Sequence, residues 1–321
     1  MKARSMPRRI THALRNLAMH GVLALAVTLP LAAQRTHVLL VIGLSGAPQF
    51  KRSFEASAQA AREVAKNRWG VNDSSLIVLT EDSTRTALSS GRSTRANIAQ
   101  AFLKLSSRVQ PGDVVFVMLM GHGSGEGAQS KVNLPGPDAT AAEYASWLGG
   151  FARQQVVFVN AATGSGDFVP VLKGSNRVVV TATKTANERN ESVFLQYFAG
   201  ALGLDAADAD KDGRVSVFEM FRFARTEVGK VYTSTNRMQT EHALVSDSLL
   251  ASRVAFGKSA ASADPRITAL IVDRQALESE VASLRSRKAT MTANAYDTEL
   301  ERLLLLLAER TKALRAAGGG K

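Results

Sequence analysis

The sequence predicts an α/β sandwich around a mostly parallel sheet, followed by a C-terminal helical element. Apolar segments alternate with segments of helical periodicity, which is the pattern of strands joined by crossover helices. The apolar segments do not alternate with polar residues, so we expect strands that helices cover on both faces. With 321 residues, 45% of them apolar, the chain is long enough for one large domain and an appendage.

The first part of the chain contains two expected strands and two expected helices. These elements are, in order, a strand at 37–43, a helix at 50–67, a strand at 75–79, a polar loop at 80–93, and a helix that Ser93 or Thr94 caps and Pro111 stops.

The next strand ends at a histidine. Seven consecutive apolar residues, 114–120, lead directly into His122, which lies between Gly121 and Gly123. Functional groups in parallel sheets lie on the loops beyond the carboxyl ends of the strands. Glycines allow the backbone to turn sharply there and to approach other groups closely. His122 is therefore a candidate site residue.

Two further apolar strands end in small polar residues. They are expected at 155–159 and 177–183, after a loop at 123–138 and a helix that begins near residue 140. Because parallel strands end at the same edge, we expect His122 and the segments 160–166 and 181–191 to meet there.

The N-terminus is typical of a secretory signal peptide. Five basic residues precede the apolar run 21–33, which ends in Ala32-Ala33. We therefore predict a signal peptide at 1–33 and an exported chain, periplasmic or secreted, with an uncleaved membrane anchor as the alternative. The formal net charge of +12 falls to about +7 without those five residues. No patch of basic and aromatic residues accompanies this charge, so we expect no nucleic-acid partner.

The C-terminal element begins where the composition changes. Residues 255–264 are rich in alanine and serine, and we place a linker at 258–264 between a domain at 34–257 and a helical tail at 265–321. Leucines recur at sevens on either side of a break near 292–295, which predicts a helical hairpin or a coiled coil. The tail either packs on its own domain or mediates self-association. Arg274 and Lys288 at core-like positions favour a short or partly exposed seam.

Four segments together resemble one peptidase family. These are 121–123, 160–162, 182–192 and 240–243, within residues 36–257. Their order and strand context resemble the caspase clan, most closely the legumain (asparaginyl endopeptidase) family and its bacterial relatives. The resemblance implies a caspase-like α/β/α sandwich. It also implies that His122 is general acid and base, that the N–H of Gly123 binds the oxyanion, and that a cysteine follows an acidic-Ala pair on the next strand.

The sequence departs from this family at its nucleophile. Ala162 stands where the family has its cysteine, and Asn160 stands where the family has an acidic residue of the substrate pocket; the chain contains no cysteine at all. A hydroxyl is a much poorer nucleophile than a partly ionised thiol. We therefore predict a catalytically inactive homologue that binds a peptide or protein ligand or assembles with other chains. The alternative is an active hydrolase in which Ser165 is the nucleophile and His122 the base.

A second motif predicts a calcium site. Residues 208–219 match the twelve-residue EF-hand loop at every ligand position and have glycine at position six. Helical patterns at 193–204 and 217–228 flank the loop. Hard oxygen ligands at this spacing suit Ca²⁺ in a structural role, although such loops usually occur in pairs. The predicted ligands are Asp208, Asp210, Asp212, Arg214 through its carbonyl oxygen, Ser216 and Glu219.

Overall fold

The structure is a computed structural model that describes residues 34–82, 88–256 and 264–318. The predicted signal peptide at 1–33 and almost all of the predicted linker at 258–264 lie outside the described residues. Within the described residues, the predicted α/β class with a mostly parallel sheet is confirmed, and helices form the C-terminal part of the chain.

Among the described residues, the central sheet has seven strands. They are β1 (Thr36–Ile42), β2 (Leu76–Thr80), β3 (Gly91–Arg92), β4 (Val114–Met120), β8 (Gln155–Asn160), β9 (Arg177–Thr181) and β11 (Leu244–Val245). Their order across the sheet is β11-β9-β8-β4-β1-β2-β3. β11 runs antiparallel to β9, and every other neighbouring pair is parallel.

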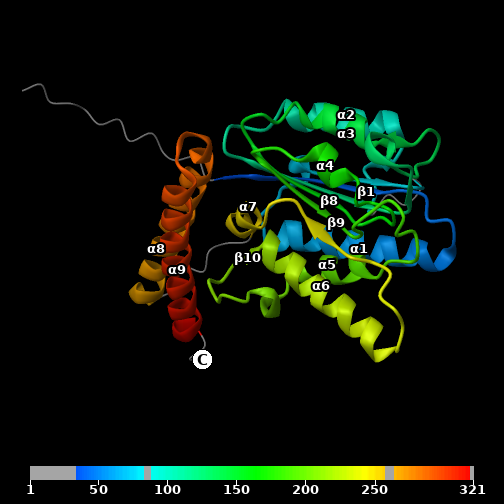
Figure 1. Ribbon diagram of the computed structural model, residues 1–321. Helices are drawn as coiled ribbons and strands as arrows, with labels where there is room; N and C mark the ends of the chain where they lie inside the picture. Colours follow the sequence, from blue (N-terminus) through cyan, green and yellow to red (C-terminus); the bar gives the residue numbers. More distant parts are fainter. Residues whose placement is uncertain (1–33, 83–87, 257–263, 319–321) are drawn as a thin grey trace, which may run out of the picture. The chain divides into compact units, whose positions relative to one another are not determined.

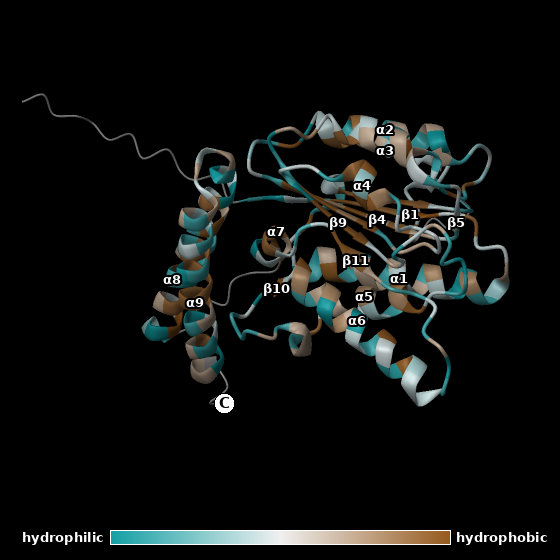
Figure 2. Ribbon diagram, viewed as in Figure 1, coloured by the Kyte–Doolittle hydropathy of each residue, from teal (hydrophilic) through white to brown (hydrophobic). Residues whose placement is uncertain are grey.

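Helices cover both faces of this sheet (Figure 1). One face carries α1 (Pro48–Asn67), α5 (Phe194–Ala201) and α6 (Val217–Ser234), and the other carries α2 (Arg95–Ser106), α3 (Ala141–Leu148) and α4 (Phe168–Leu172). Each strand therefore contributes to two apolar cores. In β4, Phe116 and Met118 pack into the core on the α1 face, whereas Val115 and Val117 pack into the core on the α2 face. Apolar residues accordingly fill the strands in Figure 2.

Short strands extend this framework. β5 (Gly123–Ser124), β6 (Lys131–Val132) and β7 (Ala139–Thr140) form a small antiparallel sheet immediately after His122. β10 (Val215–Ser216) pairs with β12 (Ala255–Phe256), and α7 (Ser248–Arg253) lies between them in sequence. β12, the strand that precedes the C-terminal helices, is thus paired with β10 of the predicted calcium loop.

A buried carboxylate joins the beginnings of β1 and β4. Asp113 is 4% exposed and accepts hydrogen bonds from the backbone N–H of Gln110 (2.8 Å) and of Arg35 (3.2 Å). The guanidinium of Arg35 donates to it at 3.0 Å, and Nε2 of His37 lies 3.1 Å from the same oxygen. Burial would raise the pKa of Asp113, but these hydrogen bonds outweigh burial and hold the pKa below its ordinary value of 3.8.

The C-terminal helices α8 (Pro265–Ser286) and α9 (Ala293–Gly318) pack against each other. Val281 and Leu284 of α8 share a buried cluster with Tyr296 and Leu303 of α9. The two helices therefore form a hairpin within one chain, the first of the two predicted arrangements. Among the described residues, no helix combines the length and the apolar character needed to span a membrane.

Candidate functional site

His122 lies immediately beyond β4, as predicted, and is half-buried, with two aromatic side chains packed against its ring. The ring centroid of Phe50 is 4.8 Å away at an interplanar angle of 82°, and that of Phe54 is 5.5 Å away at 61°. Nε2 of His122 lies 3.2 Å from the carbonyl oxygen of Ser45. Two rings of α1 and a backbone carbonyl thus occupy the surroundings of the imidazole.

The cavity beside His122 is small. Its volume is about 90 Å³, and Phe50, Phe54, Ala161 and Thr163 are among the residues that line it. Pockets that bind small molecules usually have volumes of roughly 300–1,000 Å³. The protein's own side chains therefore fill most of the space in which a substrate would meet the imidazole.

Ala162, which has the position of the family's cysteine, lies on the opposite face of the sheet. It is fully buried in the core on the α2 face with Phe158, whereas Ala161 belongs to the core on the α1 face, which also contains Phe54. Ala162 is not among the described residues that line the cavity beside His122, although its Cβ lies 3.8 Å from the place that a Cβ on Gly123 would take. The structure brings His122 together with Ala161 and Thr163 instead.

The expected oxyanion donor is already hydrogen-bonded within the protein. The backbone N–H of Gly123 donates to Oγ1 of Thr163 at 3.3 Å. A Cβ atom at Gly123 would lie 2.6 Å from the carbonyl oxygen of Thr163 and 2.9 Å from that of Lys131, so only glycine fits there without a shift of the backbone. Close backbone packing thus requires this glycine independently of any catalytic role.

Ser165, the alternative nucleophile, is hydrogen-bonded to Thr183, which follows β9. It is 1% exposed, and its Oγ accepts a hydrogen bond from the N–H of Thr183 and lies 3.3 Å from Oγ1 of the same residue. Within the described part of the chain, Ser165 is not among the residues that line the cavity beside His122.

Asn160, at the position of the family's acidic pocket residue, points into the protein. It is 1% exposed, its Oδ1 accepts a hydrogen bond from the N–H of Ala162 at 3.1 Å, and its Nδ2 is buried with no hydrogen-bond partner among the described residues. Asn160 therefore shapes the turn after β8 and does not face an open pocket.

The two remaining segments of the resemblance lie against each other. Glu241, 2% exposed, accepts hydrogen bonds from Oγ of Ser192 (2.5 Å) and from the N–H groups of Val193 (2.9 Å) and Phe194 (3.2 Å). Nδ1 of His242 lies 2.8 Å from a carboxylate oxygen of Glu188. Glu241 thereby satisfies backbone donors at the beginning of α5, which helices otherwise leave without partners.

The predicted calcium loop connects α5 to α6 and gathers its aspartates. Carboxylate oxygens of Asp208, Asp210 and Asp212 all lie within 4.8 Å of one another. Gly213 has φ +81, in the left-handed region that favours glycine, as the sharp turn at position six requires. Asp208 accepts hydrogen bonds from the N–H groups of Gly213 (2.9 Å) and Asp212 (3.1 Å), which fix its carboxylate inside the turn.

The last two side-chain ligands of the motif, Ser216 and Glu219, also cap the N-terminus of α6. Oγ of Ser216 accepts a hydrogen bond from the N–H of Glu219 at 3.2 Å, and Oε2 of Glu219 accepts from the N–H of Ser216 at 2.9 Å, a reciprocal capping box. Oε1 of Glu219 accepts from the N–H of Ala209 at 2.9 Å. The guanidinium of Arg214 donates to the carbonyl oxygen of Ala255, so this side chain points away from the aspartates.

The loop concentrates negative charge in a buried place. Burial, together with repulsion from Glu219 and Asp208, raises the pKa of Asp212 to about 6. Burial also raises the pKa of Glu219. Such shifts follow from gathering several carboxylates in a buried place, and a divalent cation bound there would favour their ionised forms.

A basic residue of the C-terminal hairpin contacts this loop, and sequence reasoning did not assign it to the site. Arg274 of α8 is 6% exposed, and its guanidinium forms ion pairs with Asp210 and, at 2.5 Å, with Asp212. The carboxylate of Glu278, one turn later on α8, lies 3.7 Å from its Nε. The available signal was an arginine at a core-like heptad position, which indicates a charge that needs a buried partner.

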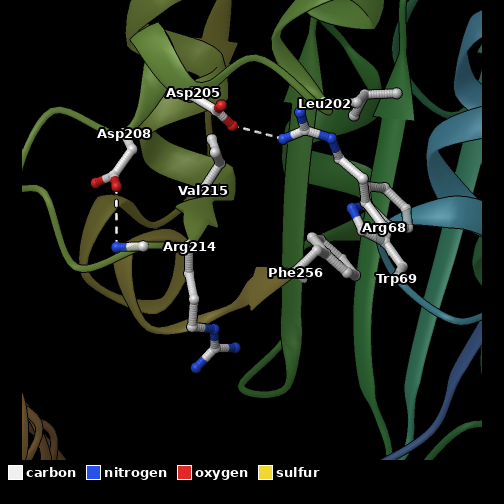
Figure 3. A pocket seen from close by; sticks show the side chains of 9 residues that line it. Arg68, Trp69, Leu202, Asp205, Asp208, Arg214, Val215 and Phe256 are labelled. Carbon is white, nitrogen blue, oxygen red and sulfur yellow. Dashed lines mark hydrogen bonds and ion pairs between the residues drawn. The ribbon is translucent and has the colours of Figure 1, made fainter. Parts of the chain in front are cut away.

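A second cavity, of about 280 Å³, lies beside the loop (Figure 3). Asp208 and Arg214 line one side, and Trp69 and Phe256 line the other, with their rings stacked 4.2 Å apart. Arg68 and Asp205 also line the cavity and form an ion pair at 2.6 Å. β12, which contains Phe256, thus contacts both the calcium loop and Trp69, which follows α1.

Comparisons with known proteins assign no family. No protein-family model and no curated protein matches the chain. Among solved structures, the chain is similar to the crystal structure of protein GSU0716 from Geobacter sulfurreducens, with 12% identity and a TM-score of 0.41 over 72% of this chain and 96% of that one. A likeness at this level assigns neither an activity nor a ligand.

Proposed function

We propose that the chain is an exported, calcium-binding homologue of legumain-like peptidases that has lost catalysis and acts as a binding or assembly module. One observation carries the calcium part. Three aspartates at the spacing of an EF-hand loop converge within 4.8 Å between two helices. Peptides or proteins are the proposed ligands, self-association through the C-terminal helices is the proposed mode of assembly, and no nucleic acid is involved.

Several contacts support the loss of catalysis. No thiol exists in the chain, and Ala162 is buried on the face of the sheet opposite His122. The N–H of Gly123, which the resemblance gives as an oxyanion donor, donates to Thr163 instead. The cavity beside the imidazole measures only about 90 Å³. A peptidase of this kind needs a nucleophile, a base and an oxyanion donor that act on one carbonyl group, and a cavity that admits this group.

The competing proposal, a hydrolase in which Ser165 attacks with the help of His122, has less support. The hydroxyl of Ser165 is buried against Thr183 and would have to leave its hydrogen bonds to reach the imidazole. The test is release of fluorophore from peptides that end in Asn, Asp or Arg. We expect no release above that of the His122→Ala variant. Turnover that both His122→Ala and Ser165→Ala abolish would establish the hydrolase.

Replacement of Ala162 by cysteine tests the geometry directly. Because position 162 faces the core on the α2 face, we expect the Ala162→Cys variant to resist thiol-reactive peptide probes in the folded state. Thr163→Cys is the matched comparison, since residue 163 lines the cavity beside His122. Labelling at position 162 that depends on His122 would contradict the arrangement described here.

The calcium site is tested by thermal unfolding. A ligand that binds only the folded state stabilises it by about 2.7 kcal/mol when its concentration is 100 times Kd. Millimolar Ca²⁺ should therefore raise Tm, and the Asp208→Ala, Glu219→Ala double variant should lose the increase. Asp205→Ala is a suitable control, because Asp205 precedes the loop and pairs with Arg68. An unchanged Tm in the parent protein, together with no heat of binding by calorimetry, would remove the calcium site.

A further inference from the structure

We propose that Arg274 is a tethered competitor for the calcium loop, so that Ca²⁺ binding and docking of α8 on the loop oppose each other. Binding of Ca²⁺ then favours release of the C-terminal hairpin from the calcium loop. This inference rests on the proposed calcium site and concerns the regulation of that site.

The first argument is the overlap of positions. The guanidinium of Arg274 pairs with Asp210 and Asp212, two of the three aspartates whose oxygens lie within 4.8 Å of one another. Ca²⁺ binds carboxylate oxygens at about 2.3–2.6 Å and needs six to eight oxygen ligands. The oxygens of Asp210 and Asp212 cannot make both sets of contacts at once.

The second argument is the charge that burial imposes on Arg274. The side chain is only 6% exposed, and its Nε is buried with no hydrogen-bond partner among the described residues. A buried charge is tolerated only while opposite charges compensate it. If Ca²⁺ takes the aspartates, Arg274 loses Asp210 and Asp212, keeps only Glu278 at 3.7 Å from its Nε, and is left beside a divalent cation. Repulsion between the two cations then favours movement of α8 away from the loop.

The third argument is the way the loop is joined to the hairpin. β10, at positions eight and nine of the loop, pairs with β12, and the side chain of Arg214 donates to the carbonyl oxygen of Ala255 in β12. β12 is the last described element before α8. β12 is therefore fixed to the loop by strand pairing, and α8, the next described helix, contacts the same loop through Arg274. The tether keeps the competing guanidinium close to the aspartates.

Thermodynamic linkage sets the size of the expected effect. If docking of Arg274 weakens Ca²⁺ binding by some factor, Ca²⁺ weakens docking by the same factor, and such couplings are typically about 5- to 150-fold. The Arg274→Gln variant removes the competitor and keeps a polar side chain. It should bind Ca²⁺ at least about fivefold more tightly than the parent protein.

The control is a second arginine on the same helix. Arg285 also belongs to α8, but it pairs with Asp247 at 3.3 Å and not with the loop. Arg285→Gln changes the net charge by the same amount. If Arg274 acts only through general electrostatic repulsion of Ca²⁺, the two variants should show similar changes in Kd. If it acts by competition at the loop, the Kd of Arg285→Gln should remain within about twofold of the parent value, since exposed charges are screened by salt.

A distance measurement tests the movement without substitution of Arg274. Because the chain has no cysteine, nitroxide labels can be attached at Asn67→Cys in α1 and Ala276→Cys in α8, both exposed positions. Double electron–electron resonance would report the distance between the labels with EDTA and with Ca²⁺. We expect Ca²⁺ to lengthen or broaden the distribution. Asp208→Ala, Glu219→Ala in the labelled chain should abolish the response.

The outcomes separate this inference from the calcium site itself. If neither the parent protein nor Arg274→Gln binds Ca²⁺ by calorimetry, the calcium site fails and the competition fails with it. If both bind with equal Kd, or if the label distances stay constant at saturating Ca²⁺, the calcium site stands and the competition is wrong. Should Arg274→Gln not fold, the label distances in the chain that retains Arg274 decide the question.

Discussion

The cluster around Asp113 allows a quantitative test of what holds β1 to β4. In the Asp113→Asn variant one carboxylate oxygen becomes an NH₂ group, which faces donors from Gln110, Arg35 or both. A hydrogen bond to a charged acceptor contributes about 1.5–3 kcal/mol, and the half-exposed Arg35 adds at most about 1 kcal/mol. We expect a loss of about 2 kcal/mol, which corresponds to roughly a 30-fold change in the unfolding equilibrium constant.

The pH dependence of this loss has a defined sign. Because the pKa of Asp113 is lower in the folded protein than its ordinary value of 3.8, its contribution is fully present above about pH 4. It is lost as the pH falls below 3.8 and through the folded pKa. The difference in stability between parent and variant should therefore shrink between pH 4 and pH 2.

Urea unfolding at several pH values measures this difference. Other carboxylates titrate in the same range, but their effect is common to parent and variant and cancels in the difference. Asp73→Asn is the control, since Asp73 is exposed and pairs with Lys66 on the surface. A difference between parent and Asp113→Asn that is the same at pH 3 as at pH 7 would refute the reasoning, and so would a variant as stable as the parent.

Two further predictions concern a glycine and a buried glutamate. Gly123→Ala should destabilise the protein by about 1–3 kcal/mol, because its Cβ would lie 2.6 Å from a carbonyl oxygen. Gly229→Ala, within α6 and with no atom within 4 Å of the added Cβ, should stabilise by about 0.5–1 kcal/mol, so the two Tm shifts should have opposite signs. Glu241→Gln should cost about 1.5–3 kcal/mol in urea unfolding, because its carboxylate accepts hydrogen bonds from Ser192, Val193 and Phe194. A neutral result would mean that water satisfies those donors equally well.

The sheet could be predicted from the sequence because burial on both faces leaves a clear pattern. The expected strand at 114–120 has the bounds of β4, and the expected helix at 50–67 differs from α1 only by two residues at its beginning, where Pro48 occupies the first turn. The expected loop at 123–138 contains β5 and β6 instead. Strands of two residues have no periodicity to detect, so sequence patterns do not reveal them.

Which residues lie together at the two candidate sites depends on tertiary packing, and local sequence patterns do not predict this packing. Ala162 and Thr163 lie in the turn after β8, where strand alternation no longer applies, so the sequence does not show which of the two lies beside His122. The heptad pattern indicated a partly exposed seam at Arg274, whereas this side chain is buried against Asp210 and Asp212. A contact between residues more than 60 positions apart is set by how α8 packs on the domain.

The two edge strands of the central sheet affect how readily the protein aggregates at high concentration. Both outermost strands, β3 and β11, are two residues long, and β11 is antiparallel to its neighbour. Unpaired N–H and C=O groups along an outer strand are the template on which chains add to one another and form fibrils, and very short outer strands limit that template. Concentrated samples are therefore expected to resist β-type aggregation, and Leu304 and Leu305 on the partly exposed face of α9 become the more favourable place for a second copy to bind.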